Sequence, residues 1–192
     1  MKAVLISIQP KWVAKIASGE KTIEVRKTKP NLQTPFKCYI YCTQCSKKGV
    51  PLLVGKDGQV DFGDYRNACN CDCDGNVDWF IGEGKVIGEF VCKGIMRPHD
   101  SLKLMSKQSC VTEEELFEYS NGKTLYGWRI ADLKIYDKPK ELSEFYAWKK
   151  CNSCRETGYE STACVFDEEC KVPYKIARPP QSYMFVEELQ NG

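Results

Sequence analysis

Short apolar runs, separated by turn residues, follow one another along most of this chain. Several of them alternate apolar and polar positions with the two-residue period of a strand that is buried on one face. Clusters of Gly, Asp, Asn and Pro separate the runs and indicate turns. The predicted strands are residues 3–8, 22–27, 37–43, 51–54, 77–81, 84–92, 126–137 and 182–189.

A few segments carry the pattern of a helix instead. Residues 10–19 (PKWVAKIASG) begin with a proline that suits a first helical turn, carry an apolar stripe, and end in Gly19, which suits a helix C-terminus. In residues 112–120 (TEEELFEYS), Thr112 and Glu115 have the spacing of a capping box. Residues 138–148 predict one or two further helical turns.

Many short strands with one early helix predict an α+β, mainly β fold, namely a small, partly open β-barrel surrounded by a few helices. The length of 192 residues suits one domain with insertions, or a domain with a small module. We expect the first, with a single domain over residues 1–192. The turn-rich residues 46–82 and the cysteine-rich residues 151–170 are the predicted insertions.

Charge is unevenly distributed, although the net charge is only +2. Residues 1–50 hold ten Lys or Arg against two acids, which suits a partner that carries phosphates. A solvated basic surface is the alternative, and charge by itself does not separate the two. The apolar residues 3–8 are too short to span a membrane and lack a signal-peptide layout, so we expect a cytoplasmic protein without membrane contact.

The strand at residues 22–27 is unusually charged. Its two-residue period places Thr22, Glu24 and Arg26 on one face, and Lys21 lies at the turn just before it. A carboxylate between two cations, with a hydroxyl nearby, can bind a phosphate or a polar base edge, and it can also act as a base. The alternative is a surface ladder of ion pairs with no function.

The same residues resemble a known family. Gly19, Lys21, Glu24 and Arg26 reproduce the G-x-K-x-x-E-x-R signature of the ASCH domain, a relative of the PUA-type RNA-binding domains. Residues 1–45 and the later apolar segments are similar to prophage-type, bacterial ASCH proteins, and the two insertions are not. The resemblance implies a β-barrel with a cleft lined by the signature residues, and a site for RNA or a nucleotide-like or nucleobase-like ligand.

The resemblance also raises the question of catalysis. Some small ASCH proteins are amidohydrolases that deacetylate N4-acetylcytidine with Thr, Lys and Glu, and their threonine follows the lysine by three residues. Glu24 occupies that position in this chain, and Thr22 lies elsewhere on the same predicted face. Ribonuclease activity is also attributed to family members, and the resemblance implies Glu24 with Lys21 or Arg26 as its acid–base set.

Aromatic residues in the matching segments are candidates for stacking on a base. Trp12, Tyr41 and Trp128 are the candidate ligand contacts, although aromatic residues in such segments more often belong to the core. His99 is the only histidine and lies beside a proline in a predicted loop. A mechanism that depends on histidine therefore has little to use.

Twelve cysteines in a chain without signs of export suggest metal binding more than disulfides. The C-x2-C-x9-C-x5-C spacing of residues 151–170 can enclose a structural Zn²⁺ with no open position for water. The predicted zinc ligands are Cys151, Cys154, Cys164 and Cys170. A second zinc site is left open for Cys42, Cys45, Cys69, Cys71 and Cys73. Cys38 and Cys92, inside strands, are expected to be buried apolar residues.

Three functions remain in view. The first is an ASCH module that binds RNA or a nucleotide-like ligand. The second is a hydrolase that acts on RNA or modified nucleosides. The third is a zinc-stapled adaptor whose cysteine-rich insertions contact another protein. The sequence predicts neither the ligand nor the oligomeric state.

Overall fold

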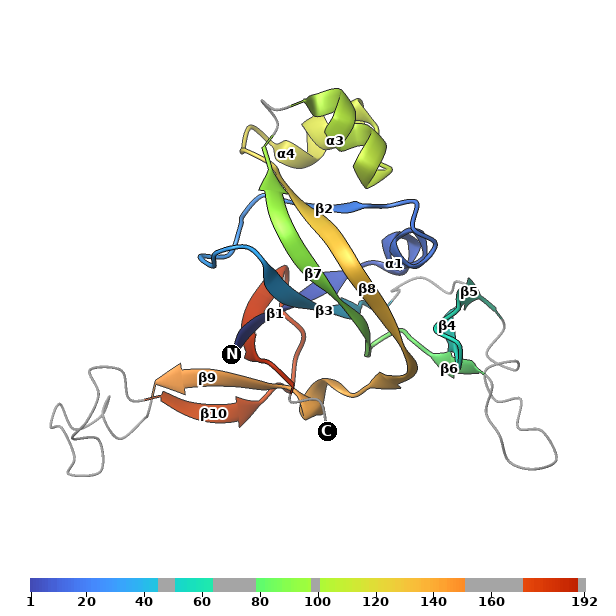
Figure 1. Cartoon of the computed structure of the whole chain (residues 1–192), viewed down its shortest axis with the longest axis vertical. Coiled ribbons are helices and arrows are strands. Elements are labelled where there is room, and N and C mark those ends of the chain that lie inside the picture. The colour runs from blue at the N-terminus through green and yellow to red at the C-terminus, as the bar shows by residue number, and fades with distance from the viewer. Residues whose placement is uncertain (45–50, 64–78, 98–100, 151–170, 190–192) are drawn as a thin grey trace, which may run out of the picture.

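Six strands form one mixed sheet at the centre of the molecule, in the order β11-β1-β3-β7-β8-β2 (Figure 1). The computed structural model describes residues 1–44, 51–63, 79–97, 101–150 and 171–189. Neighbouring strands are antiparallel except β1 and β3, which are parallel. The strands are β1 (Lys2–Ile8), β2 (Ile23–Arg26), β3 (Phe36–Cys42), β7 (Val86–Met96), β8 (Tyr126–Lys140) and β11 (Tyr183–Glu187).

This sheet curls strongly. Strands in a sheet lie about 4.8 Å apart, so a flat sheet would place β8 and β11, four steps apart in the order, about 19 Å from each other. Instead, the rings of Trp128 in β8 and Tyr183 in β11 meet with their centroids 5.2 Å apart. Breaks in the register between β7 and β8 mark where the pair bends. The mainly β, barrel-like fold predicted from the sequence is therefore confirmed.

The concave side of the sheet holds the main apolar core. Helix α1 (Pro10–Ala17) packs Val13 and Ile16 against it. Pro10 occupies the first turn, and Gly19, with a φ of +78°, adopts the left-handed conformation just beyond the helix end, as predicted. Cys38 and Cys92 are fully buried in this core, which confirms their expected apolar role.

Two further helices cover β2. They are α3 (Leu102–Ser109), which the sequence pattern did not reveal, and α4 (Glu113–Ser120). The predicted capping box begins α4: Glu115 N donates to Thr112 Oγ1 (3.1 Å), and Thr112 N donates to Glu115 Oε2 (3.0 Å). Met105 of α3 and Leu116 of α4 form a second core with Ile23 of β2. The signature strand is thus buried on both sides.

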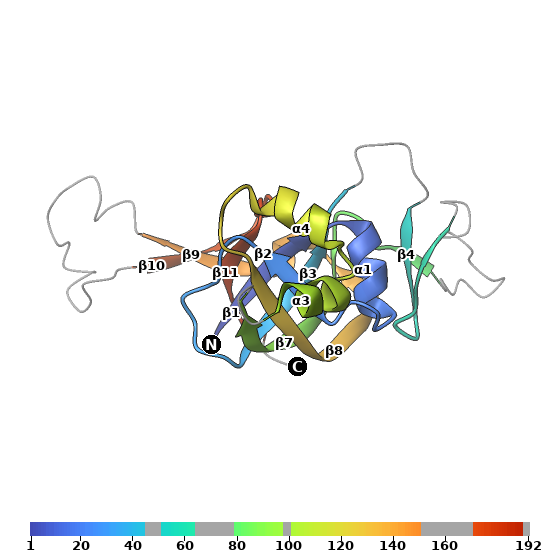
Figure 2. The same ribbon diagram turned by 90° about the horizontal axis from the view of Figure 1, so that it is seen from above.

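Two small sheets extend on opposite sides of the main sheet (Figures 1 and 2). One is made of β4 (Leu52–Gly55), β5 (Val60–Phe62) and β6 (Trp79–Ile81). The other, which we call the ribbon, pairs β9 (Tyr146–Lys150) with β10 (Lys171–Lys175). Of the helical turns predicted for residues 138–148, only the 3₁₀ turn Leu142–Glu144 forms, and the strand β9 follows it. Within the described residues, none of the helices has the length and apolarity needed to cross a membrane.

Candidate functional site

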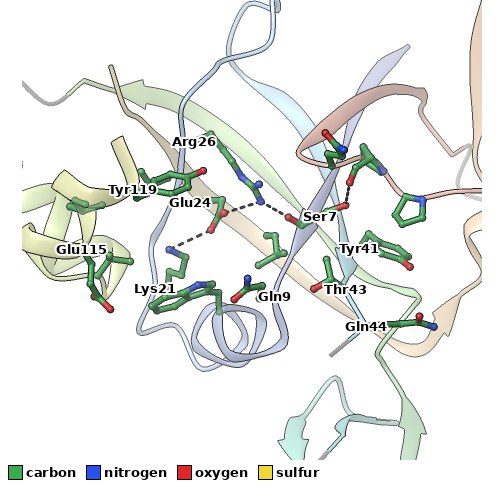
Figure 3. A pocket seen from close by; sticks show the side chains of 18 residues that line it. Ser7, Gln9, Lys21, Glu24, Arg26, Tyr41, Thr43, Gln44, Glu115 and Tyr119 are labelled. Carbon is green, nitrogen blue, oxygen red and sulfur yellow. Dashed lines mark hydrogen bonds and ion pairs between the residues drawn. The ribbon is translucent and has the colours of Figure 1, made fainter. Parts of the chain in front are cut away.

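A cavity of about 630 Å³ lies where the C-terminal ends of β1 and β3 meet α1, β2 and α4 (Figure 3). The loop before β11 contributes the rest of its wall. Its apolar and aromatic lining includes Trp12, Tyr41 and Tyr119. The other polar lining residues are Ser7, Gln9, Lys21, Glu24, Arg26, Thr43, Gln44, Glu115 and Gln181.

Three charged side chains of the signature form one buried group in this cavity. Glu24 Oε1 lies 3.0 Å from Arg26 Nη2, and Glu24 Oε2 lies 3.4 Å from Lys21 Nζ (Figure 3). Lys21, Glu24 and Arg26 are only 3%, 6% and 9% exposed. An ion pair this well buried costs desolvation energy on both partners, unlike an exposed ladder. The alternative of a surface ladder therefore does not apply.

Lys21 is held from two further sides. Its Nζ donates to the carbonyl oxygen of Ser109 at the end of α3 (2.9 Å), and it lies 5.1 Å from the centre of the Trp12 ring. Burial lowers the pKa of Lys21, and the nearby Glu24 carboxylate opposes that change. The amine is consequently easier to deprotonate than a lysine in water.

Arg26 joins the signature strand to β1. Its Nη2 also donates to the backbone carbonyl of Ser7, and its Nε has no hydrogen-bond partner among the described residues. Glu24 Oε2 likewise accepts no hydrogen bond there. Arg26 therefore holds Glu24 through a single nitrogen, not through two. Although Glu24 Oε2 keeps its ion pair with Lys21, a buried donor and a buried acceptor in residues that line the cavity lack a hydrogen bond, and such groups are rare and costly.

Hydrogen bonds join the strand β1 to the loop before β11 beside the cavity. Ser7 Oγ donates to the carbonyl of Pro180 (2.6 Å), and Ser7 N donates to the carbonyl of Ser182 (2.9 Å). Ser7, Gln9, Thr43 and Gln44 were not identified from the sequence. They converge because β1 and β3 are parallel and end at the same edge, and no local pattern shows that pairing.

The structure brings most of the predicted ligand contacts together. Lys21, Glu24, Arg26, Trp12 and Tyr41 all line the cavity, and their role toward a ligand stays a prediction.

Thr22 and Trp128 do not line it. Thr22 precedes β2, its side chain is exposed, and its backbone bonds to Gln108 and Ile130. Trp128 is fully buried, with its ring against Phe36 and Tyr183 in the core. The prediction that Thr22 shares a face with Glu24 and Arg26 assumed that all three belong to one strand. The strand β2 begins at Ile23, so its two-residue period does not extend to Thr22.

The predicted zinc ligands Cys151, Cys154, Cys164 and Cys170 lie outside the described residues, as do His99, Cys45, Cys69, Cys71 and Cys73. Cys42 is described and lies fully buried in the main core, where burial raises the pKa of its thiol. Metal ligation requires the thiolate, so this position does not favour the second zinc site. Among the residues that the structure describes, no group of three or more His, Cys, Asp or Glu is arranged to hold a metal ion.

The curled sheet and the charged cavity define a small, barrel-like, mainly β fold with a recessed cavity. The family model of the ASCH domain matches residues 6–179, and the chain belongs to that family.

Solved structures agree with this assignment. The crystal structure of ASCH from Zymomonas mobilis is 15% identical, with a TM-score of 0.53 over 97% of this chain and 88% of that chain. A mutant of the same Zymomonas mobilis protein gives 14% identity and a TM-score of 0.52 over 98% of this chain and 92% of that one. At these identities the likeness shows the fold alone. A comparison with curated proteins gives no match.

Proposed function

We propose that the cavity binds a nucleobase, either in RNA or in a nucleotide-like ligand. The observation that carries the proposal is that Glu24 Oε2 and Arg26 Nε are buried without a hydrogen-bond partner among the described residues. A carboxylate oxygen accepts and a guanidinium N–H donates. The edge of a nucleobase offers donors and acceptors side by side, so one base edge can satisfy both groups.

The remaining walls suit the same ligand. A volume of about 630 Å³ lies in the usual range of small-molecule sites. Trp12, Tyr41 and Tyr119 offer ring faces on which a base can stack. Lys21 and Arg26 are balanced by Glu24 and Glu115 in the lining, so the formal charge of the cavity is zero and suits a neutral base. The ASCH domain is a PUA-like family often linked to RNA binding, and this supports the proposal.

Calorimetric titration with the four common ribonucleosides and their monophosphates tests this function. Glu24→Gln keeps the size of the side chain but replaces an acceptor oxygen with a donor amide, so binding should weaken at least about 10-fold. Glu89→Gln is the matched control, because Glu89 also pairs with a lysine, Lys37 (3.2 Å), but does not line the cavity. Equal affinity of the parent and Glu24→Gln for a ligand that binds would refute the proposal.

Hydrolysis of RNA or modified nucleosides is the second candidate. The lowered pKa of Lys21 favours it, since a lysine that loses its proton more easily can serve in acid–base catalysis, and its Nζ lies 3.4 Å from Glu24 Oε2. Incubation with N4-acetylcytidine and with labelled RNA, followed by chromatography, should show products that are lost in Lys21→Met. Binding without any product would leave only the first function.

A structural zinc ion at Cys151, Cys154, Cys164 and Cys170 remains a separate proposal. The cysteine spacing supports it, and so does the ribbon, because Lys150 pairs with Lys171 and these residues directly flank the cysteine segment. Element analysis of protein purified without chelator should find at least one zinc ion per chain, and less in Cys151→Ser. A metal-free, fully folded sample would contradict the proposal.

A further inference from the structure

The ribbon presents aromatic side chains on one face. Side chains alternate along a strand, so Tyr146 and Trp148 share one face. Their direct partners on β10, Lys175 and Pro173, lie on the same face. Tyr146 is 38% exposed and Trp148 is 47% exposed. Ala147, between them on the other face, is buried in a core with the main sheet. One face therefore anchors the ribbon, and the outer face remains open.

Charge on the ribbon is of one sign. Its ten residues include four lysines and no acid. The acids that precede it are engaged elsewhere: Glu141 pairs with Lys85 (2.8 Å), and Glu144 lies 3.7 Å from Lys140. Lys175 Nζ lies 6.0 Å from the centre of the Tyr146 ring. Aromatic rings can stack on unpaired bases while the surrounding cations contact the phosphates that join them, so this surface suits a single strand of nucleic acid. A protein interface fits less well, since lysine is depleted at such interfaces.

The ribbon also lies close to the cavity along the chain. Only three residues separate Lys175, at the end of β10, from Pro179, which lines the cavity, so the two are four Cα steps apart. A chain segment of that length spans at most about 14 Å. One end of the ribbon is thus within reach of a strand whose base occupies the cavity.

We propose that the outer face of the ribbon binds single-stranded RNA, namely the nucleotides that flank the base held in the cavity. Trp148 and Tyr146 stack on bases, and the lysines of the same face, Lys175 among them, contact phosphates. The strand must be single, because paired bases do not offer their faces to side chains. That these nucleotides flank a base in the cavity rests on the proposed function. The contacts of the ribbon with RNA are tested separately.

The first test is fluorescence anisotropy with a labelled oligouridylate of about twelve nucleotides. Trp148→Ala should weaken binding by about 5- to 100-fold, the loss expected for one stacked base. Phe62→Ala is the matched control, because Phe62 is 42% exposed on β5, on the opposite side of the molecule (Figure 1). This control should bind the oligouridylate like the parent.

The second test uses salt. Lys175→Gln should lower the slope of log affinity against log salt by about 0.7, the value for one phosphate contact on a single strand. Lys103→Gln on α3, also exposed, should leave the slope unchanged.

The outcomes separate this inference from the function proposed for the cavity. If Trp148→Ala and Lys175→Gln bind the oligouridylate like the parent, the ribbon inference is overturned, whatever Glu24→Gln does. Equal losses in Trp148→Ala and Phe62→Ala also overturn it. If Trp148→Ala weakens binding of the oligouridylate but Glu24→Gln does not, and if ribonucleosides do not bind, the ribbon inference stands and the cavity proposal fails. Unchanged ribonucleoside binding by Trp148→Ala, with weaker oligouridylate binding, supports both.

Discussion

The cavity and the ribbon both depart from the usual placement of side chains: the cavity buries charged side chains, and the ribbon exposes aromatic ones. In the cavity, Lys21, Glu24 and Arg26 are nearly inaccessible, although residues of these types are almost always exposed. On the ribbon, Tyr146 and Trp148 are more than a third exposed, although large aromatic residues are usually much more buried. The buried charges cost desolvation energy, whereas the exposed aromatic residues only forgo the stability that full burial would add. The difference lies in how strongly each region is tied to the fold.

In the cavity the charged side chains of Lys21, Glu24 and Arg26 are part of the internal structure. Glu24 pairs with two cations, one in the turn before β2 and one at its last residue, and Lys21 also binds the end of α3. The outer face of the ribbon contributes little to the cores. Substitutions should therefore affect both stability and binding in the cavity, but only binding on the ribbon.

The largest effect should come from Glu24→Ala. It leaves Lys21 and Arg26 buried without their carboxylate, and breaking a buried pair in this way costs about 3–5 kcal/mol. Urea denaturation gives the free energy of unfolding. Glu20→Ala is the control: its pair with Lys15 (2.8 Å) is exposed, so water screens it and the stability should change little. Similar losses in both variants would contradict the structural role of Glu24.

Ile23→Ala should come next, with a loss of about 2–5 kcal/mol through a cavity in the second core. Ile23 neighbours Glu24 on β2 but does not line the cavity. Nucleoside affinity, measured well below the melting temperature, should therefore stay near that of the parent. A loss of affinity as large as that of Glu24→Gln would show that strand stability, not the carboxylate, governs binding.

A smaller effect should appear with pH. Burial lowers the pKa of Lys21 below its ordinary value of 10.5 in the folded chain. Between that lowered pKa and 10.5, the unfolded chain binds more protons at this residue, so its contribution to the free energy of unfolding rises with pH. Below the lowered pKa the contribution is constant.

Comparison with Lys21→Met isolates this residue, because all other titrating groups are shared. The stability of the parent relative to Lys21→Met should increase as the pH approaches 10.5. Urea denaturation across this pH range measures the difference. A constant difference would mean that Lys21 is hydrated in the folded protein.

The smallest effect should be that of Trp148→Ala on stability. Its ring is 47% exposed, so the free energy of unfolding should change by no more than about 0.5 kcal/mol. Thermal unfolding of this variant beside Phe62→Ala provides the measurement. A large loss would show that Trp148 supports the ribbon and would remove the contrast with the cavity.

Local sequence signals were enough for much of the fold. The early helix with Gly19 at its end and the Thr112 capping box depend on neighbours within a few residues, and they are found as predicted. Helix α3 was missed although Ser101 caps it, because it shows no apolar stripe: Leu102 and Leu104 are exposed, and only Met105 and Ser109 are buried. The ribbon was missed since its strands pair across a long intervening segment.

The candidate site was predictable only in part. The signature residues Lys21, Glu24 and Arg26 lie on one short segment, so a motif could reveal them. Ser7 and Thr43 reach the same cavity through the parallel pairing of β1 and β3, which depends on the whole sheet. Trp128 shows the opposite limit: an aromatic residue in a matching segment proved to be core, because the curl of the sheet encloses it.

The hydrogen bonds of Ser7 have a consequence for synthesis of the chain. The strand β1 leaves the ribosome before the other strands of the main sheet, yet its outer neighbour β11 leaves after all of them. Until residues 180–187 emerge, β1 keeps an open edge of the kind that pairs with other chains. The wall that Pro180 adds to the cavity is missing for the same period. Translation must therefore pass residue 181 before the cavity can be complete, and a chain cut short before residue 179 lacks this wall.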